Sequence, residues 1–182
     1  RRQHHRLEYA AVLPADLVDD IAELGLLVTA VPSNEARWGG PGGMFETRLG
    51  TARASWTSPL RDLADRGVPL AFGSANSGDP MDPWAAVNAA QHRSRDHHEI
   101  TRLEAVSAHT LGGRLASRQD RHVGPLRAGM RADLAVWEGD PFQDDDPTGH
   151  RCVLTTVKGR RTHGRVMELP AWDDETPQPR RS

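Results

Sequence analysis

Short apolar segments alternate with amphipathic segments through the first half of the chain. Residues 26 to 31 (LLVTAV) and 68 to 74 (VPLAFGS) have the length and apolar character of strands that are buried on both faces. A third strand is expected at residues 5 to 11, and helices are expected at residues 14 to 25, 58 to 67 and 83 to 92. Since strands that alternate with helices pair in parallel and carry the helices outside, the sequence predicts an α/β fold.

The pattern changes after residue 100. Thr101 and Glu104 have the spacing of a capping box, which predicts a helix that runs through about residue 115. Gly112 and Gly113 either weaken this helix or let it pack closely against a neighbour.

Beyond this helix the sequence predicts short strands that are separated by turns and lack intervening helices. Residues 121 to 167 hold two groups of such strands, with Gly, Asp and Pro between them, and should form a small sheet. Residues 168 to 182 are polar and rich in proline, so this tail is expected to be disordered. The predicted units are therefore residues 1–120, 121–167 and 168–182.

Composition narrows the function classes. The chain has 182 residues and a formal net charge of −2, with acidic and basic residues interspersed, so we expect neither a nucleic-acid partner nor an anionic membrane surface. No stretch has the ~20 apolar residues of a membrane span, and the start lacks the apolar run of a signal peptide. The single cysteine, Cys152, forms no internal disulfide. We therefore expect a cytoplasmic protein.

Because the chain begins without methionine at an expected strand, we also expect a C-terminal piece of something longer.

Four motifs in a fixed order resemble a known family. They are RLEYA at residues 6–10, FGSA at 72–75, EAVSAHTL at 104–111 and GMRADLAV at 129–136. Each motif alone has low specificity, but together and in this order they resemble the C-terminal part of a metal-dependent amidohydrolase. The branch concerned includes N-substituted formamide deformylases, and the resemblance covers about residues 4 to 167.

The resemblance implies a fold and a chemistry. It implies a TIM (β/α)8 barrel that carries a small β-sandwich, of which this chain would supply about three barrel strands with their helices and part of the sandwich. A full barrel takes ~250 residues, so the first strands and the His-X-His ligand pair of the family would lie outside this chain. The family uses one or two divalent metals, zinc-type, to hydrolyse non-peptide carbon-nitrogen bonds of amide-like small molecules. A zinc ion with an open position lowers the pKa of its bound water to ~7.

Two positions that the resemblance assigns to chemistry hold other residues. Tyr9 stands where the family has a ligand histidine, and Ala75 stands where it has the catalytic aspartate. A phenol with a pKa of ~10 is a poor zinc ligand, and alanine has no donor atom. Asn76 cannot accept a proton, whereas Asp79 is either a replacement base or a turn-stabilising residue. We therefore expect this chain alone to bind no metal and to be catalytically incomplete.

A long glycine-containing connection between residues 32 and 56 is the best remaining candidate for a functional loop. A structureless loop of this length after a barrel strand would lie at the mouth of the barrel. Trp38 would then form an aromatic pocket wall, together with Ser74 and Asn76 from the end of the next strand. The alternative is that Trp38 and Phe45 only pack the loop onto the barrel.

Other conspicuous residues have structural interpretations. Adjacent histidines on a strand point to opposite faces, so His4-His5 and His97-His98 are not expected to bind a metal as pairs. We expect His109 to be a packed helix residue rather than a ligand, and residues 144 to 146 (DDD) to be a solvated turn rather than a calcium site. Residues 158 to 161 (KGRR) are typical of a strand turn with charged edges.

Two functional hypotheses remain open. In the first, the chain belongs to a hydrolase of non-peptide carbon-nitrogen bonds and supplies the pocket wall and part of the sandwich. In the second, it is a degenerate or truncated relative that acts as a scaffold or a binding module without chemistry. Three parallel strands cannot close a barrel, so we also expect marginal stability, self-association or a complementary N-terminal half.

Overall fold

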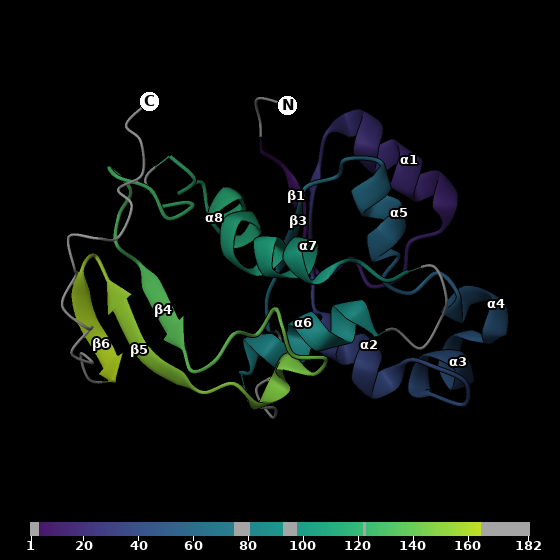
Figure 1. Cartoon of the computed structure of the whole chain (residues 1–182). Coiled ribbons are helices and arrows are strands. Elements are labelled where there is room, and N and C mark those ends of the chain that lie inside the picture. The colour runs from purple at the N-terminus through teal and green to yellow at the C-terminus, as the bar shows by residue number, and fades with distance from the viewer. Residues whose placement is uncertain (1–3, 75–80, 93–97, 122, 165–182) are drawn as a thin grey trace.

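A three-stranded parallel sheet with the strand order β1-β2-β3 lies in the first half of the chain (Figure 1). The computed structural model describes residues 4–74, 81–92, 98–121 and 123–164. The helices of this half are α1 (Ala15–Leu24), α2 (Pro32–Trp38), α3 (Met44–Leu49), α4 (Thr51–Ala54), α5 (Leu60–Asp65), α6 (Pro83–Gln91), α7 (Arg102–Ser107), the π-helical turn η1 (Ala108–Gly112) and α8 (Gly113–Ala116). Within these described residues, no helix is long and apolar enough to cross a membrane.

The parallel pairing confirms the predicted alternation of strands and helices. Strand β2 (Leu27–Ala30) is central and pairs in parallel with β1 (Arg6–Leu7) and with β3 (Leu70–Phe72). All three strands are shorter than predicted, and β1 differs most. Its predicted range of 5 to 11 is wrong because Tyr9 adopts a left-handed conformation, with φ of 55°, which turns the chain out of the sheet.

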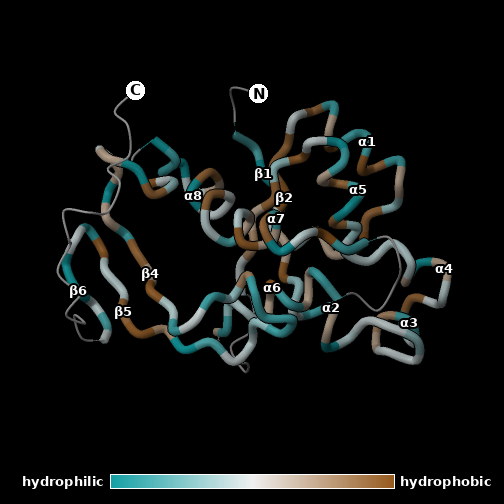
Figure 2. The backbone as a smooth tube through the Cα atoms, in the orientation of Figure 1, coloured by the Kyte–Doolittle hydropathy of each residue, from teal (hydrophilic) through white to brown (hydrophobic). Residues whose placement is uncertain are grey.

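Two hydrophobic clusters fix the helices on the sheet. Val18 and Ile21 of α1 pack with Leu63 of α5 and Val28 of β2, and each of these side chains is at most 4 % exposed. The second cluster joins β2 and β3 to α5, α6 and α7; it comprises Ala30, Leu60, Phe72, Trp84, Val87, Ala90, Ile100, Ala105 and Ala108. Figure 2 shows apolar residues along β2, and apolar residues that alternate with polar ones along α1 and α5. Burying each large aliphatic side chain contributes about 1.5–3 kcal/mol.

Predicted helix starts are confirmed at two caps. The carboxylate of Asp82 accepts from the backbone N–H groups of Trp84 and Ala85, at 2.9 and 3.1 Å. Thr101 and Glu104 form the capping box at the start of α7. Glu104 also accepts two hydrogen bonds of 3.0 Å from Arg61 of α5, and this guanidinium lowers the pKa of Glu104 to about 2. The cap therefore joins α7 to α5.

The segment between residues 32 and 56 is helical, so the prediction of a structureless loop is wrong. Pro32 begins α2, where a missing N–H costs nothing. Glycines at positions 39, 43 and 50 flank the helices and divide the segment into the short pieces α2, α3 and α4. The glycine content that suggested a loop therefore sets only where each helix ends.

A second, antiparallel sheet contains β4 (Leu134–Trp137), β5 (Cys152–Val157) and β6 (Arg160–Gly164), in that order. It confirms the predicted small sheet, and the 3-10 turn η2 (Pro147–Gly149) lies between β4 and β5. Lys158 and Gly159 both have positive φ, 53° and 73°, as the two-residue turn of a tight hairpin requires. Residues 168–182 lie outside the described residues.

Gly112 lets the helical segment approach β3 more closely than any other residue would. A Cβ atom at Gly112 would lie 2.0 Å from the backbone oxygen of Leu70, whereas a Cβ at Gly113 would meet nothing within 4 Å. The expectation that these glycines permit close packing is therefore confirmed for Gly112.

These neighbouring glycines give a matched pair of variants. We expect Gly112→Ala to destabilise the chain by about 2 kcal/mol or more, because the backbone of β3 cannot yield to a methyl group. Gly113→Ala should stabilise it by about 0.5–1 kcal/mol, because alanine restricts the unfolded chain and has the better helix propensity. Urea unfolding measures both, and equal effects of the two changes would contradict this packing.

Candidate functional site

The carboxyl ends of β1, β2 and β3 meet at one edge of the parallel sheet. In α/β sheets, ligands bind outside this edge because loops that follow different strands converge there. Tyr9 follows β1, Ser33 follows β2, and Gly73 and Ser74 follow β3. Two pockets lie among these residues.

The larger pocket has a volume of about 560 Å³. It lies between the residues after β3 and the helices α2, α6 and η1, and is lined by Ser33, Ala36, Arg37, Gly73, Ser74, Met81, Asp82, Pro83, Ala85, Ala86 and His109. Of the residues expected at a substrate pocket, Ser74 lies on this wall. Ala75, Asn76 and Asp79 lie outside the described residues, so their roles stay predictions.

Trp38 packs within its own segment. Its ring meets Phe45 of α3 edge-on, with centroids 6.4 Å apart, and the guanidinium of Arg37 lies 5.5 Å from its centroid. This contact joins two residues of the same segment, so the alternative that Trp38 and Phe45 pack the segment onto the barrel stays a prediction. A role of Trp38 in substrate binding stays a prediction.

His109 brings an uncharged imidazole to the wall of the larger pocket. Its ring lies edge-on to Phe72 at 5.4 Å, and its Nε2 is buried without a hydrogen-bond partner among the residues that the structure describes. Burial lowers the pKa of His109 to about 4, so the ring is neutral at pH 7. The sequence predicted the packing but not the pocket. His109 and Gly112 both face β3, but this segment is π-helical, so an α-helical spacing in the sequence does not indicate their shared face.

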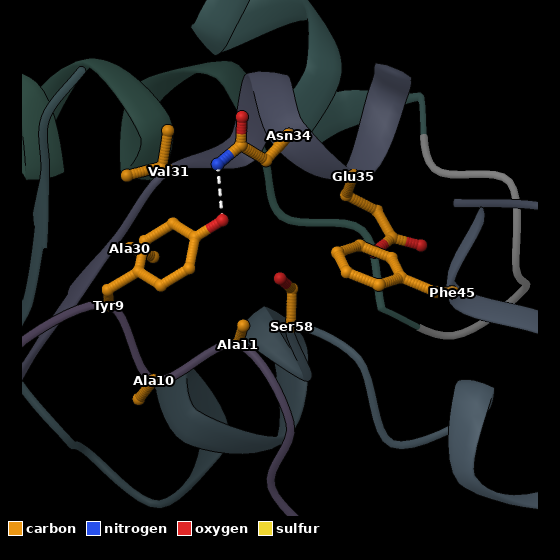
Figure 3. Close-up of a pocket in the computed structure, with 9 residues that line it drawn as sticks. All are labelled: Tyr9, Ala10, Ala11, Ala30, Val31, Asn34, Glu35, Phe45 and Ser58. Atoms are coloured by element: carbon orange, nitrogen blue, oxygen red, sulfur yellow. Dashed lines mark hydrogen bonds between the residues drawn. The ribbon is translucent and has the colours of Figure 1, made fainter. Parts of the chain in front are cut away.

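The smaller pocket lies beside Tyr9 and has room for roughly one water molecule, at about 10 Å³ (Figure 3). The Tyr9 hydroxyl accepts a hydrogen bond of 2.5 Å from Nδ2 of Asn34, which is 6 % exposed. Figure 3 shows the Ser58 side chain directed into the same space, between Tyr9 and Glu35. Ser58 also has a positive φ, 45°, so two strained residues line this pocket.

Hydrogen bonds to Thr29 hold Tyr9 at the end of β1. The Thr29 hydroxyl donates to the Glu8 carboxylate at 2.6 Å and accepts from the backbone N–H of Tyr9 at 3.0 Å. The hydrogen bond from Thr29 lowers the pKa of Glu8. Tyr9 is therefore fixed from both sides, by Thr29 at its backbone and by Asn34 at its hydroxyl.

The donor atoms that the structure describes at this edge do not fit a zinc ion. The Tyr9 hydroxyl is committed to Asn34, and a neutral phenol is a poor zinc ligand. The His109 ring packs edge-on against Phe72, and its Nε2 is buried. Over the described ranges, no three His, Cys, Asp or Glu side chains gather as a metal site requires.

Comparison with known proteins finds a family match along most of the chain. The model of a family described as "Amidohydrolase family" matches residues 1–163. The putative amidohydrolase YtcJ of Bacillus subtilis is 24% identical over 178 residues, which are 91% of this chain and 32% of the relative. An N-substituted formamide deformylase of Arthrobacter pascens is 27% identical over 160 residues, which are 84% of this chain and 29% of the relative. The chain thus spans about a third of the length of these curated relatives.

A solved structure agrees with the fold. Atrazine chlorohydrolase TrzN from Arthrobacter aurescens TC1, solved with zinc, superimposes with a TM-score of 0.64 at 20% identity. The match covers 87% of this chain and 36% of the other. At this identity the likeness concerns the fold alone.

The buried His109 predicts a dependence of stability on pH. His109 is protonated only near pH 4 in the folded chain, whereas a histidine in the unfolded chain is protonated near ~6.5. The contribution of the neutral His109 to the free energy of unfolding is therefore complete above about pH 6.5 and is lost as the pH falls towards 4. Relative to His109→Gln, the wild type should lose about 2–3 kcal/mol of unfolding free energy over this range. Urea unfolding at several pH values measures the difference. The variant of an exposed histidine, His5→Gln, should follow the wild type; parallel curves for His109→Gln and wild type would contradict the assignment.

Proposed function

This chain belongs to the amidohydrolase family, and we propose that it is the C-terminal part of a hydrolase that acts on non-peptide carbon-nitrogen bonds of small amide-like molecules. The observation that carries this proposal is the pocket of about 560 Å³ outside the carboxyl ends of β2 and β3. Its volume lies within the range of small-molecule sites, about 300–1,000 Å³. The similarity to an N-substituted formamide deformylase supports an amide as the substrate class.

The wall of this pocket suits a small, uncharged amide. Ala36, Ala85 and Ala86 provide apolar surface, and the hydroxyls of Ser33 and Ser74 are donors suited to an amide carbonyl. His109 adds an aromatic surface without charge, since burial lowers its pKa to about 4. Binding and orientation of the substrate are therefore the roles we assign to this chain.

The chemical step requires groups from outside the described residues. The family uses a divalent metal, but the donor atoms around Tyr9 and His109 do not fit a zinc ion. We propose that this chain alone is inactive and that any hydrolytic metal centre is held by a complementary N-terminal part. Residues 1–120 would then be the last strands of a barrel, and residues 121–167 a share of a β-sandwich.

A second candidate function is a binding module without catalysis. It is favoured by the hydrogen bond from Asn34 to the hydroxyl of Tyr9. Tyr9 stands where the family has a metal-ligand histidine, and its hydroxyl already has this partner. Alanine at position 75 offers no base either. Such a relative would bind the same class of small molecule and release it unchanged.

Filling the larger pocket tests the proposed binding. Ala85 is half-buried and lines the pocket, so Ala85→Phe should weaken binding of N-methylformamide by about tenfold or more, because the ring occupies the volume that the ligand needs. Saturation-transfer NMR with the purified chain measures this binding. Ala52→Phe makes the same change at an exposed position of α4 and should bind like the wild type.

Two further readouts test the proposed inactivity of the chain alone. Release of formate from the amide and the zinc content of the purified chain are measured on the same samples. Binding without turnover and without stoichiometric zinc agrees with both candidates for the chain alone, whereas turnover by the chain alone would overturn its proposed inactivity. Equal loss of binding in both phenylalanine variants, or no binding by wild type, would refute this pocket as the site.

The open edges of the parallel sheet predict the behaviour of the isolated chain. In the described part of the molecule, β1 and β3 each pair with β2 alone, so each has an edge without a strand neighbour. We expect self-association in size-exclusion chromatography with light scattering, together with a broad thermal transition. A compact monomer that melts cooperatively would contradict the need for a complementary part.

A further inference from the structure

The connection between β4 and β5 folds back against the start of α6 (Figure 1). Trp84, at the first turn of α6, is 6 % exposed and is surrounded by rings from this region. Trp137 and Phe142 meet it edge-on, at 5.5 and 6.4 Å between centroids, and His150 lies 6.4 Å away. These contacts form the junction between the two sheets.

Both ring nitrogens of His150 face acceptors. Nδ1 lies 2.6 Å from the backbone oxygen of Glu138, and Nε2 lies 2.9 Å from a carboxylate oxygen of Asp144. A backbone carbonyl and a carboxylate can only accept, whereas a neutral imidazole has one N–H donor and one acceptor. The two hydrogen bonds can therefore exist together only when the ring carries both protons.

We propose that His150 is a pH-responsive clamp that holds the β4–β5 connection against Trp84. In its doubly protonated form the ring ties Glu138 to Asp144 across the connection. Loss of one proton leaves either the carbonyl or the carboxylate without its donor, and the Asp144 side chain is 61 % exposed, so water can solvate this carboxylate away from the ring. Deprotonation of the ring at higher pH therefore loosens the junction.

A second anchor of the same connection does not respond to pH in this range. The guanidinium of Arg102, at the start of α7, donates to the backbone oxygens of Pro141, Asp144 and Asp145 at 2.6, 2.5 and 3.0 Å. It also donates to the side chain of Gln91 at 2.8 Å. Arginine keeps its charge at all relevant pH values, so residues 141 to 145 stay attached to α6 and α7 when His150 changes state.

The other charged groups around the clamp have their own partners. The Glu138 carboxylate pairs with Arg151 of the same region at 2.9 Å. Asp146 accepts from the backbone N–H of Thr148, and His92 at the end of α6 lies 3.2 Å from a backbone oxygen through its Nδ1. Among the described residues, Asp144 is thus the charged side chain bonded to the His150 ring.

The clamp acts close to the larger pocket. Trp84 stands between Pro83 and Ala85, and both of these neighbours line that pocket. Trp84 thus connects His150 with the residues of the pocket wall, independently of whether the pocket binds an amide.

Hydrogen exchange of the full chain at about pH 6 and pH 8, corrected for intrinsic rates, tests the proposal. In wild type, amide protection of residues 146 to 151 should fall by about three- to tenfold at the higher pH, because one charged hydrogen bond is lost, whereas residues 141 to 145 should stay protected by the Arg102 anchor. His150→Gln should have no such difference. Asp144→Asn should also lose the difference, because an amide can donate to the deprotonated ring or accept from the protonated ring.

Two comparisons keep the result specific. Peptides from the β5–β6 hairpin serve as the internal reference, and His163→Gln alters an exposed histidine on β6 and should respond like wild type. A pH-independent wild type would overturn the proposal. A pH response that persists in Asp144→Asn would also overturn it, because this variant removes the charged acceptor. This second variant keeps the proposal testable if His150→Gln fails to fold.

Discussion

Pairing of β2 on both of its edges is the constraint on which the rest of the molecule depends. It leaves Val28 with no exposed surface, because β1 and β3 flank it while α1 and α5 cover it. Parallel pairing also places the carboxyl ends of three strands at one edge of the sheet, so residues that are far apart in the sequence lie close together there. Both pockets at this edge are consequences of that arrangement.

Local signals were readable from the sequence, and contacts between distant segments were not. The caps at Asp82 and Thr101 depend on residues two or three positions away, so their residue types predict them. The early end of β1 depends on the backbone of Tyr9, which hydrogen-bonds Thr29 twenty residues later. The helices between residues 32 and 56 were missed because glycine was weighed as a loop former, although it also ends helices.

In the candidate site, too, local features could be predicted from the sequence, whereas contacts between distant residues could not. The predicted strands extend further than the observed ones, and Ser74, which was expected at a substrate pocket, lines the larger pocket, where its role stays a prediction. Asn34 was missed, because neither its residue type nor its neighbours indicate a bond to Tyr9. The acidic run at residues 144 to 146 was expected to be a solvated turn, and Asp144 is indeed 61% exposed, yet one of its oxygens reaches His150. Sequence identifies such a group as charged but does not identify its partner.

The π-helical turn η1 affects how the sequence of this chain is aligned with sequences that form an unbroken α-helix in this segment. A single π turn inside an α-helix accommodates a surplus residue, so α7 and α8 are out of helical phase with each other. An alignment of this segment with an unbroken α-helix needs a gap within residues 108 to 112 to bring equivalent faces together. Without the gap, residues after His109 would be matched to positions on the wrong side of the helix, and the glycine that touches β3 would be compared with a solvent-facing residue.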